Sequence, residues 1–206
     1  MEQIRRVVTG HNEVGEAILL SDDAVALASL FGDEMTGAVV WTTGSVPADN
    51  ANDAMGDERD AGSSLKGGSV MRVTEFGPGF STPMHRTLSI DYAMVLSGEL
   101  ELELDSGAVA RLREGDVIVQ RGSAHLWRNP SADTPCRIVI CMIEAQPITV
   151  GTATLKPTPM WRMLASLVAG KLRKPNKRPV EALGRQGSAR PQRNSQRKSA
   201  ASWKVA

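Results

Sequence analysis

The sequence of 206 residues is poor in aromatic residues, cysteine and histidine, and it has no long apolar run. Aromatic residues make up 4% of the chain although hydrophobic residues reach 41%, so the core must be largely aliphatic. No apolar stretch approaches the roughly 18 to 20 residues that span a bilayer, and the chain opens Met-Glu-Gln-Ile-Arg-Arg without a hydrophobic signal segment. The sequence therefore predicts a cytoplasmic protein with no transmembrane segment.

The scarcity of cysteine excludes a disulfide scaffold. Cys136 and Cys141 lie in the run Cys-Arg-Ile-Val-Ile-Cys-Met-Ile, which is typical of a strand. Because successive side chains of a strand point to opposite faces, an odd separation keeps these two cysteines from bridging each other.

Basic and acidic residues are unevenly distributed, although the formal net charge is +1. Residues 156–206 contain 13 Lys and Arg and a single Glu, whereas the rest of the chain contains 11 basic and 22 acidic residues. Like charges at such a density resist compaction. The sequence therefore predicts an acidic folded body followed by a basic tail.

Short apolar segments separated by turn residues indicate an all-β fold over residues 69–150. The clearest segment is Glu99-Leu-Glu-Leu-Glu-Leu-Asp105, whose strict alternation places leucines on a core face and glutamates in water. The 19 glycines of the chain suit its many turns. We expect strands near 69–76, 84–96, 99–105, 108–113, 116–120, 124–128 and 136–145. Many short antiparallel strands without helices between them predict a β-barrel or jelly roll.

The residues before this region are predicted to form an N-terminal extension. Two β-rich arms, 6–10 and 17–21, flank a polar turn and indicate a hairpin, and 37–43 is a third extended segment. We expect the strands of residues 1–45 to pack on the barrel or on a dimer mate. Residues 46–68 are polar and lack periodicity, which predicts a mobile surface loop.

Residues 151–206 are predicted to form a short amphipathic helix and a mostly disordered basic tail. Apolar residues recur at helical spacing over 160–172, and packing on the barrel or a dimer mate is favoured over a membrane-surface role. Residues 173–206 are rich in Arg, Lys, Pro and Ser. Trp203 is the one aromatic residue of this tail, too little for a stacking platform, so no specific nucleic acid is expected and a solvated extension is preferred.

Two of the three histidines lie inside the strand series, in segments that resemble the two motifs of the cupin superfamily. The first motif of that superfamily has Gly, two His, a carboxylate and Gly at set spacings. Here it reads Gly79, His85, Thr87, Asp91 and Gly98, with Thr in place of the second His and Asp in place of Glu.

The second motif has Gly, Pro, Gly, His and Asn at set spacings. Gly115, Gly122, His125 and Asn129 match it, with one residue missing before the second Gly and no Pro. The resemblance covers about residues 69–145. The sequences around the two motifs are similar to those of small single-domain cupin proteins of fungi and bacteria. It implies a cupin (RmlC-like) β-barrel, with an N-terminal hairpin and a basic tail added to it.

The resemblance also implies a metal site. In metal-binding cupins the histidines and the carboxylate converge on one divalent metal inside the barrel, and His85, Asp91 and His125 remain here as ligands. Two imidazoles and a carboxylate suit Fe(II) or Zn(II), with Mn or Ni as further choices. Even separations predict that His85, Thr87 and Asp91 share one face of a strand.

A metal-free pocket is the alternative that the same residues leave open. His85 and His125 would then be neutral, with hydrogen bonds to Asp91, Thr87 or Tyr92, and would act in acid–base catalysis or simple ligand binding. The candidate catalytic residues are accordingly His85, His125 and Tyr92.

Three further residues are candidates for substrate binding. Thr87 shares the predicted inward face, Arg121 precedes His125 in a turn where it could hold a carboxylate at the barrel mouth, and Trp127 is predicted to be a pocket wall or core. Arg86 and Arg128 are separated from the motif histidines by odd numbers of residues and are expected to face outward.

The function predicted from these features is a cupin-fold enzyme acting on a small organic, such as a polyketide-like, metabolite. Some fungal members of the family are described as cupin-domain oxidoreductases, and the resemblance implies metal-dependent oxidoreductase, decarboxylase or dehydratase chemistry. A non-catalytic, metal-free sensor or carrier is the alternative. The expected partners are a small-molecule ligand and a second copy of the chain in a homodimer, because edge strands invite pairing.

Overall fold

A computed structural model of the chain describes residues 3–51, 56–59, 61–62, 64–158 and 160. All of them belong to the first of two compact units, Met1–Arg173. Apart from Met160, the predicted helix over 160–172 and the tail over 173–206 lie outside the described residues.

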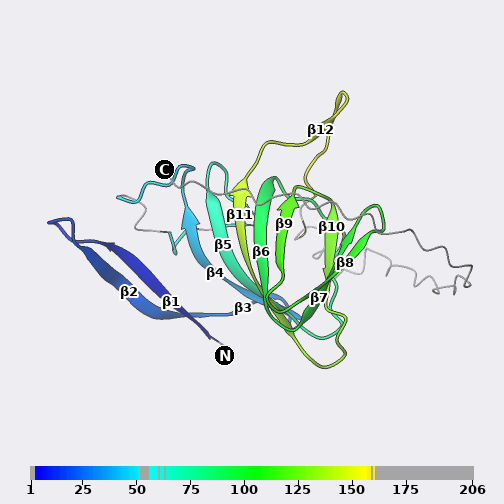
Figure 1. Cartoon of the computed structure of the whole chain (residues 1–206), viewed down its shortest axis with the longest axis horizontal. Helices are drawn as coiled ribbons and strands as arrows, with labels where there is room; N and C mark the ends of the chain where they lie inside the picture. Colours follow the sequence, from blue (N-terminus) through cyan, green and yellow to red (C-terminus); the bar gives the residue numbers. More distant parts are fainter. Residues whose placement is uncertain (1–2, 52–55, 60, 63, 159, 161–206) are drawn as a thin grey trace, which may run out of the picture. The chain divides into compact units, whose positions relative to one another are not determined.

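The described chain is nearly all β (Figure 1). Its strands are β1 (Gln3–His11), β2 (Ala17–Ala26), β3 (Ala28–Phe31), β4 (Met35–Thr43), β5 (Ser69–Phe76), β6 (Ser89–Ser97), β7 (Glu99–Leu104), β8 (Val109–Arg113), β9 (Val117–Arg121), β10 (His125–Arg128), β11 (Cys136–Glu144), β12 (Thr149–Val150) and β13 (Ala153–Thr154). The all-β prediction is confirmed.

Two antiparallel sheets form a jelly-roll barrel. The larger has six strands in the order β3-β4-β5-β11-β6-β9, and the smaller has three in the order β10-β7-β8. The segment before β6 extends the smaller sheet, because Ser81 and His85 form antiparallel bridges with Arg128 and His125 of β10. The prediction of one continuous strand over 84–96 is wrong: the chain pairs with β10 at His85 and enters the other sheet at Ser89.

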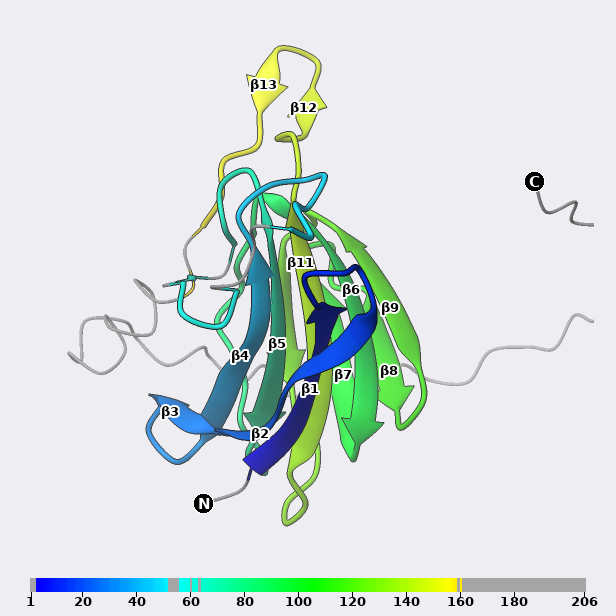
Figure 2. The same ribbon diagram turned by 90° about the vertical axis from the view of Figure 1, so that its left-hand side faces the viewer.

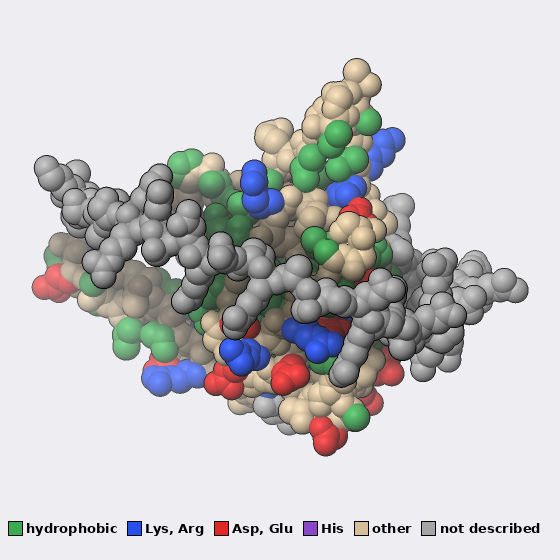
Figure 3. Space-filling view, turned by 45° about the vertical axis from the view of Figure 1, so that its right-hand side comes forward, with side chains coloured by type: hydrophobic (Ala, Val, Ile, Leu, Met, Phe, Trp, Pro, Cys, Tyr) green, Lys and Arg blue, Asp and Glu red, His purple; other side chains and the backbone are tan. Residues whose placement is uncertain are grey.

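The core lies between the sheets and follows the alternation of the strands. Phe76, Leu100 and Ile138 are at most 1% exposed and belong to one cluster with Trp127. On β7 the glutamates point to the face opposite the leucines. On that outer surface Arg128 forms ion pairs with Glu101 and Glu103. On the face drawn in Figure 3, basic and acidic side chains lie beside one another.

The base of the N-terminal hairpin packs against the outer face of the large sheet, and the rest of the hairpin extends away from the barrel (Figure 1). Leu27, Ala38 and Val73 are buried there, and Ile4 and Val25 of the hairpin pack against them. Arg6 of β1 also pairs with Asp57 in the loop after β4 and donates to the Val40 carbonyl. β4 is part of the barrel sheet itself, because it pairs with β5 along its length.

Turns join the strands where the sequence predicted them. Gly98 has a φ of 77°, and a Cβ at this position would lie 2.6 Å from the Pro135 carbonyl oxygen, so the β6–β7 turn requires glycine. The sequence analysis missed β3 and the β12–β13 hairpin, which projects beyond the ends of the long strands (Figure 2).

The described part of the chain contains no helix with the length and apolar character needed to cross a membrane. The two cysteines are free, as expected from their opposite faces: Cys136 is buried and Cys141 is partly exposed. Burial raises the pKa of the Cys136 thiol to about 11, so it belongs to the packed core and not to a reactive site.

Candidate functional site

A cavity inside the barrel receives side chains from both sheets. The smaller sheet and its extension contribute His85, His125 and Trp127, and the larger sheet contributes Asp91 and Arg72. Apolar side chains form the remaining walls, namely those of Met35, Phe76, Ile140, Met142 and Met160. A mainly apolar cavity with a few polar groups is the usual form of a small-molecule site.

His85 and His125 form the centre of this site because their backbones pair directly. Each backbone N–H donates to the other residue's carbonyl oxygen, at 2.8 and 2.9 Å. Residues opposite each other in an antiparallel pair direct their side chains to the same face. The two imidazole rings therefore lie with their centroids 4.2 Å apart, at an angle of 50°.

Backbone carbonyls set the tautomer of both imidazoles. Nδ1 of His85 lies 2.9 Å from the Pro83 carbonyl oxygen, and Nδ1 of His125 lies 3.0 Å from that of Ser123. A carbonyl accepts, so we assign the proton of each neutral ring to Nδ1 and leave Nε2 as an acceptor. The amide nitrogen of Gln120 lies 2.5 Å from Nδ1 and 2.8 Å from Nε2 of His125, and with the ring proton on Nδ1 it can donate to Nε2. Nε2 of His85 has no hydrogen-bond partner among the described residues.

Burial keeps both imidazoles uncharged at neutral pH. Desolvation lowers the pKa of His85 below its usual 6.5. It lowers the pKa of His125 to about 3, with a further contribution from the charge of His85. A neutral imidazole with a free Nε2 can accept a proton, so His85 is equipped to act as a base.

Asp91 is also buried, but its hydrogen bond is to Ser89. The Ser89 hydroxyl lies 2.5 Å from the Asp91 carboxylate and 2.9 Å from the Thr87 hydroxyl. Desolvation raises the pKa of Asp91 to about 6, and the bond from Ser89 opposes that rise. A carboxyl group with such a pKa exchanges protons near neutral pH.

The predicted metal ligands do not converge in this arrangement. Among the described residues, no three His, Cys, Asp or Glu side chains are placed so that they could hold a metal ion together. The chain changes sheets between His85 and Ser89, so that His85 and Asp91 belong to different sheets although both line the cavity. Of the three predicted ligands, the two histidines are the adjacent pair.

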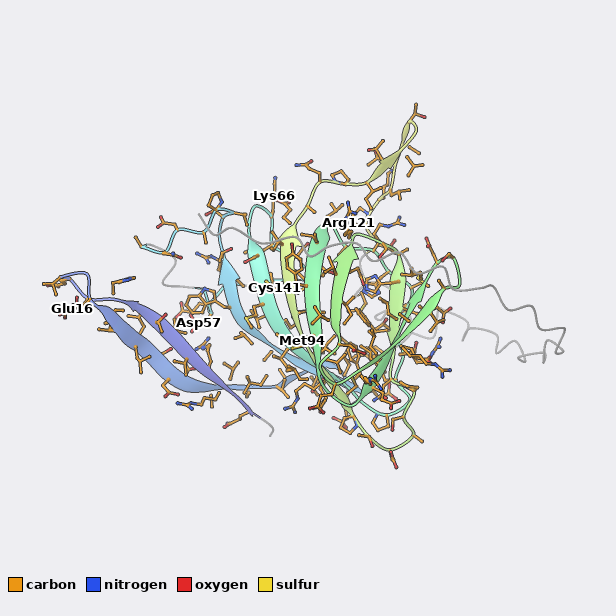
Figure 4. All side chains as sticks on the ribbon, viewed as in Figure 1. Glu16, Asp57, Lys66, Met94, Arg121 and Cys141 are labelled. Atoms are coloured by element: carbon orange, nitrogen blue, oxygen red, sulfur yellow. The ribbon has the colours of Figure 1, made fainter. Side chains whose placement is uncertain are left out.

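The structure brings most of the predicted site residues together. Thr87 and Trp127 line the cavity with the histidines and Asp91. The rings of Trp127 and His125 are in edge-on contact, with their centroids 5.5 Å apart. Tyr92 does not reach the site, because it follows Asp91 on β6 and its side chain lies on the outer face, 47% exposed. Arg121 lies at the end of β9 (Figure 4) and lines a separate outer pocket with Arg86.

Two polar residues of the site escaped the sequence analysis. Arg72 of β5 lines the cavity, and Gln120 of β9 is 3% exposed and contacts His125. Arg72 has a sequence signal, because it is separated by even numbers of residues from Val70 and Phe76, which are apolar core residues of the same strand. A charged residue at a core position of a strand indicates a functional group.

Comparison with known proteins gives consistent matches. Residues 72–143 match the sequence profile of the cupin domain. Phomopsin biosynthesis cluster protein C' of Diaporthe leptostromiformis is 41% identical over 152 residues, which cover 70% of this chain and 80% of that protein. The cupin-domain-containing oxidoreductase virC of Hypocrea virens is 34% identical over 151 residues, 70% and 78% of the respective chains. Among solved structures, the polyketide cyclase RemF from Streptomyces resistomycificus is 20% identical, covers 66% of this chain and 79% of its own, and has a TM-score of 0.42.

Proposed function

Because the chain belongs to the cupin domain family, we propose that it is an oxidoreductase-type enzyme acting on a small organic metabolite of a biosynthetic pathway. The names of its relatives support the reaction class and the pathway type. The site supports catalysis through one observation above all: His85 presents a neutral, unpartnered Nε2 to a mainly apolar cavity.

The groups of this cavity are suited to proton transfer. His85 Nε2 would remove a proton from the bound metabolite, and the neutral His125 beside it adds no competing positive charge. Asp91, with its pKa near 6, would hold or return a proton on the side of the larger sheet. Proton removal from carbon begins a dehydration, and proton removal from a hydroxyl group is one part of its oxidation, whose two electrons would pass to an external acceptor. In a decarboxylation the protonated Asp91 would return a proton to the carbon that loses CO2.

Kemp elimination of 5-nitrobenzisoxazole tests the base without knowledge of the substrate, because a base removes the proton from carbon as the N–O bond breaks to give the cyanophenolate. We expect His85→Gln to lower the protein-catalysed rate by at least about a hundredfold, and His11→Gln, on the exposed end of β1, to leave it unchanged. The wild-type rate should persist below pH 6.5, because the pKa of His85 is lowered. An unchanged rate in His85→Gln would refute the assignment of the base.

Metabolite extracts then distinguish an enzyme from a carrier or sensor. We expect that cells of the source organism with the His85→Gln variant at the normal protein level lack one metabolic product and accumulate its precursor. An unchanged metabolite profile would favour the non-catalytic binding protein, which tolerates a side chain of similar shape.

The divalent metal implied by the family stays a prediction, and elemental analysis tests it independently of the base. The protein would be incubated with Fe(II), Zn(II), Mn(II) or Ni(II) and compared with His85→Ala and His125→Ala. Near-stoichiometric metal that both variants lose would mean that Asp91 leaves Ser89 and completes the ligand set. Metal-free protein would leave the proton-transfer site as described.

A further inference from the structure

Arg72 is a cation on the wall of the barrel cavity that the proposed chemistry does not use. It lies on β5 between Val70 and Thr74, which are buried on the same inner face. Arg72 lines the cavity together with His85, Asp91 and His125. An arginine at a core position needs a compensating negative charge or a full set of acceptors.

The described residues do not supply that charge. One terminal nitrogen, Nη2, donates to the carbonyl oxygens of Ala61 and Gly62, at 3.1 and 2.9 Å. Nε and Nη1 have no hydrogen-bond partner among the described residues, and no described carboxylate forms an ion pair with them. Asp91, the other charged group of the cavity, bonds to Ser89 instead. Burial lowers the pKa of Arg72, as expected for a cation without a counter-charge.

We propose that Arg72 binds a carboxylate group of the small molecule that occupies the barrel cavity. The planar fork of a guanidinium matches a carboxylate with two parallel hydrogen bonds, and the neutral histidines place no second cation beside it. Phe76, Trp127 and Ile140 would enclose the apolar remainder of the ligand. The proposal rests on the proposed function, since it names the substrate class of the same site: an organic acid with an apolar body.

This assignment transfers to Arg72 the role that the sequence suggested for Arg121. Arg121 is exposed at the end of β9 and lines the outer pocket, whereas Arg72 faces the histidines from the opposite sheet. A substrate held between Arg72 and the two imidazoles would therefore span the cavity from one sheet to the other.

Two fluorinated probes of equal shape test the proposal by ¹⁹F NMR titration of the full chain. They are 4-fluorobenzoate, which has a carboxylate, and 4-fluorobenzamide, which has a neutral amide on the same ring. We expect wild-type protein to bind the acid at least about tenfold more tightly than the amide, because only the acid makes charge-assisted bonds. No saturable binding of the acid, or equal binding of both probes, would contradict the proposal.

Variants locate the preference at Arg72. Arg72→Gln should bind both probes equally weakly, and Arg72→Lys should keep part of the preference, because it retains the charge but not the fork. Arg111→Gln, which removes an equal charge from an exposed side chain of β8, should behave as wild type. An acid preference that survives in Arg72→Gln would overturn the proposal.

Two controls separate binding from folding and from catalysis. Arg72 also holds the Ala61–Gly62 segment, so circular dichroism and the thermal midpoint are compared for every variant; the wild-type comparison of acid and amide stands even where Arg72→Gln does not fold. His85→Gln should keep the acid preference. If Kemp elimination fails while the preference remains at Arg72, the proposed catalysis is wrong and the binding site is right.

Discussion

His85 and His125 are buried imidazoles that the fold keeps uncharged, and this has a consequence for stability. Their backbones are paired, their Nδ1 atoms lie against carbonyls, and the two residues are 6% and 2% exposed, so a charge on either ring would be poorly hydrated. In the unfolded chain both rings are hydrated and take up protons near pH 6.5. The unfolded state therefore binds more protons than the folded state as the pH falls below 6.5.

We predict that acid weakens the fold through His125. Between about pH 7.5 and about pH 5, the free energy of unfolding of wild type should fall by about 2 kcal/mol relative to His125→Gln, since one unit of pKa difference corresponds to about 1.4 kcal/mol. The sign follows from the lowered pKa of the folded state, which is about 3. Urea unfolding at the two pH values measures the difference.

Asp91 has the opposite effect on the pH dependence of the free energy of unfolding, so both proteins in that comparison must contain it. Its raised pKa, about 6 against the usual 3.8, means that the folded state holds the extra proton between these values. Stability from this group is thus present at low pH and lost as the pH rises through 6. Because wild type and His125→Gln share Asp91, the difference between them reports the histidine. Equal pH dependence in both proteins would show that His125 is not protected from protonation.

At the scale of elements, the β1–β2 hairpin shows how an N-terminal extension is joined to the barrel. Val25 of β2 packs on the small cluster formed by Leu27, Ala38 and Val73, whereas Leu19 of the same strand is 65% exposed. The ion pair of Arg6 and Asp57, the latter labelled in Figure 4, lies on the same side of the sheet. Apolar burial and an ion pair thus act at one junction.

The pair Val25 and Leu19 provides a matched test of that junction. Val25→Ala should lower the free energy of unfolding by about 1 kcal/mol, because it removes partly buried methyl groups from a packed contact. Leu19→Ala, which removes more atoms from an exposed position, should change it by less than about 0.5 kcal/mol. Equal effects, measured by urea unfolding, would mean that the hairpin does not dock on the sheet.

Sequence reasoning succeeded for elements whose pattern is local. Alternating leucines predicted β7, and turn residues separated most of the other barrel strands. It failed at residues 84–88. The rule that residues an even number apart share a face holds only within one continuous strand, and the chain changes sheets there. Because of that change, His85 lies beside His125 on the side of the smaller sheet, whereas Asp91 lies on β6 of the larger sheet.

Residues outside the two motifs were the hardest to predict. Gln120 and His125 are only five residues apart, but they lie on strands of different sheets, and the sequence contains no signal that their side chains meet. Arg72 was detectable in principle from its parity with Val70 and Phe76. A search for charged residues at apolar strand positions would have added it to the site.

For the whole molecule, the outer face of the large sheet is only half covered. The base of the hairpin packs on β4 and β5, but Tyr92, Met94, Val117 and Val119 of β6 and β9 remain between 41% and 62% exposed. They form one surface, since Tyr92 pairs with Val119 and Met94 with Val117. The hairpin itself exposes apolar side chains, among them Leu19 at 65%. A monomer rarely presents such surfaces to water.

We predict that a second copy covers this face, with the exposed apolar side of its hairpin against β6 and β9. Each chain has both surfaces, so a twofold arrangement would bury each of them once per protomer. Met94→Glu and Val119→Glu should each weaken association by at least about tenfold, because a dimer interface would have to bury the new charge. Val109→Glu is the matched control: Val109 is 49% exposed on β8 of the other sheet. Sedimentation velocity over a concentration series measures the dissociation constant of each protein. A wild-type protein that stays monomeric at about 100 μM would contradict the prediction. So would a Val109→Glu variant whose dimer is weakened as much as those of the other two variants.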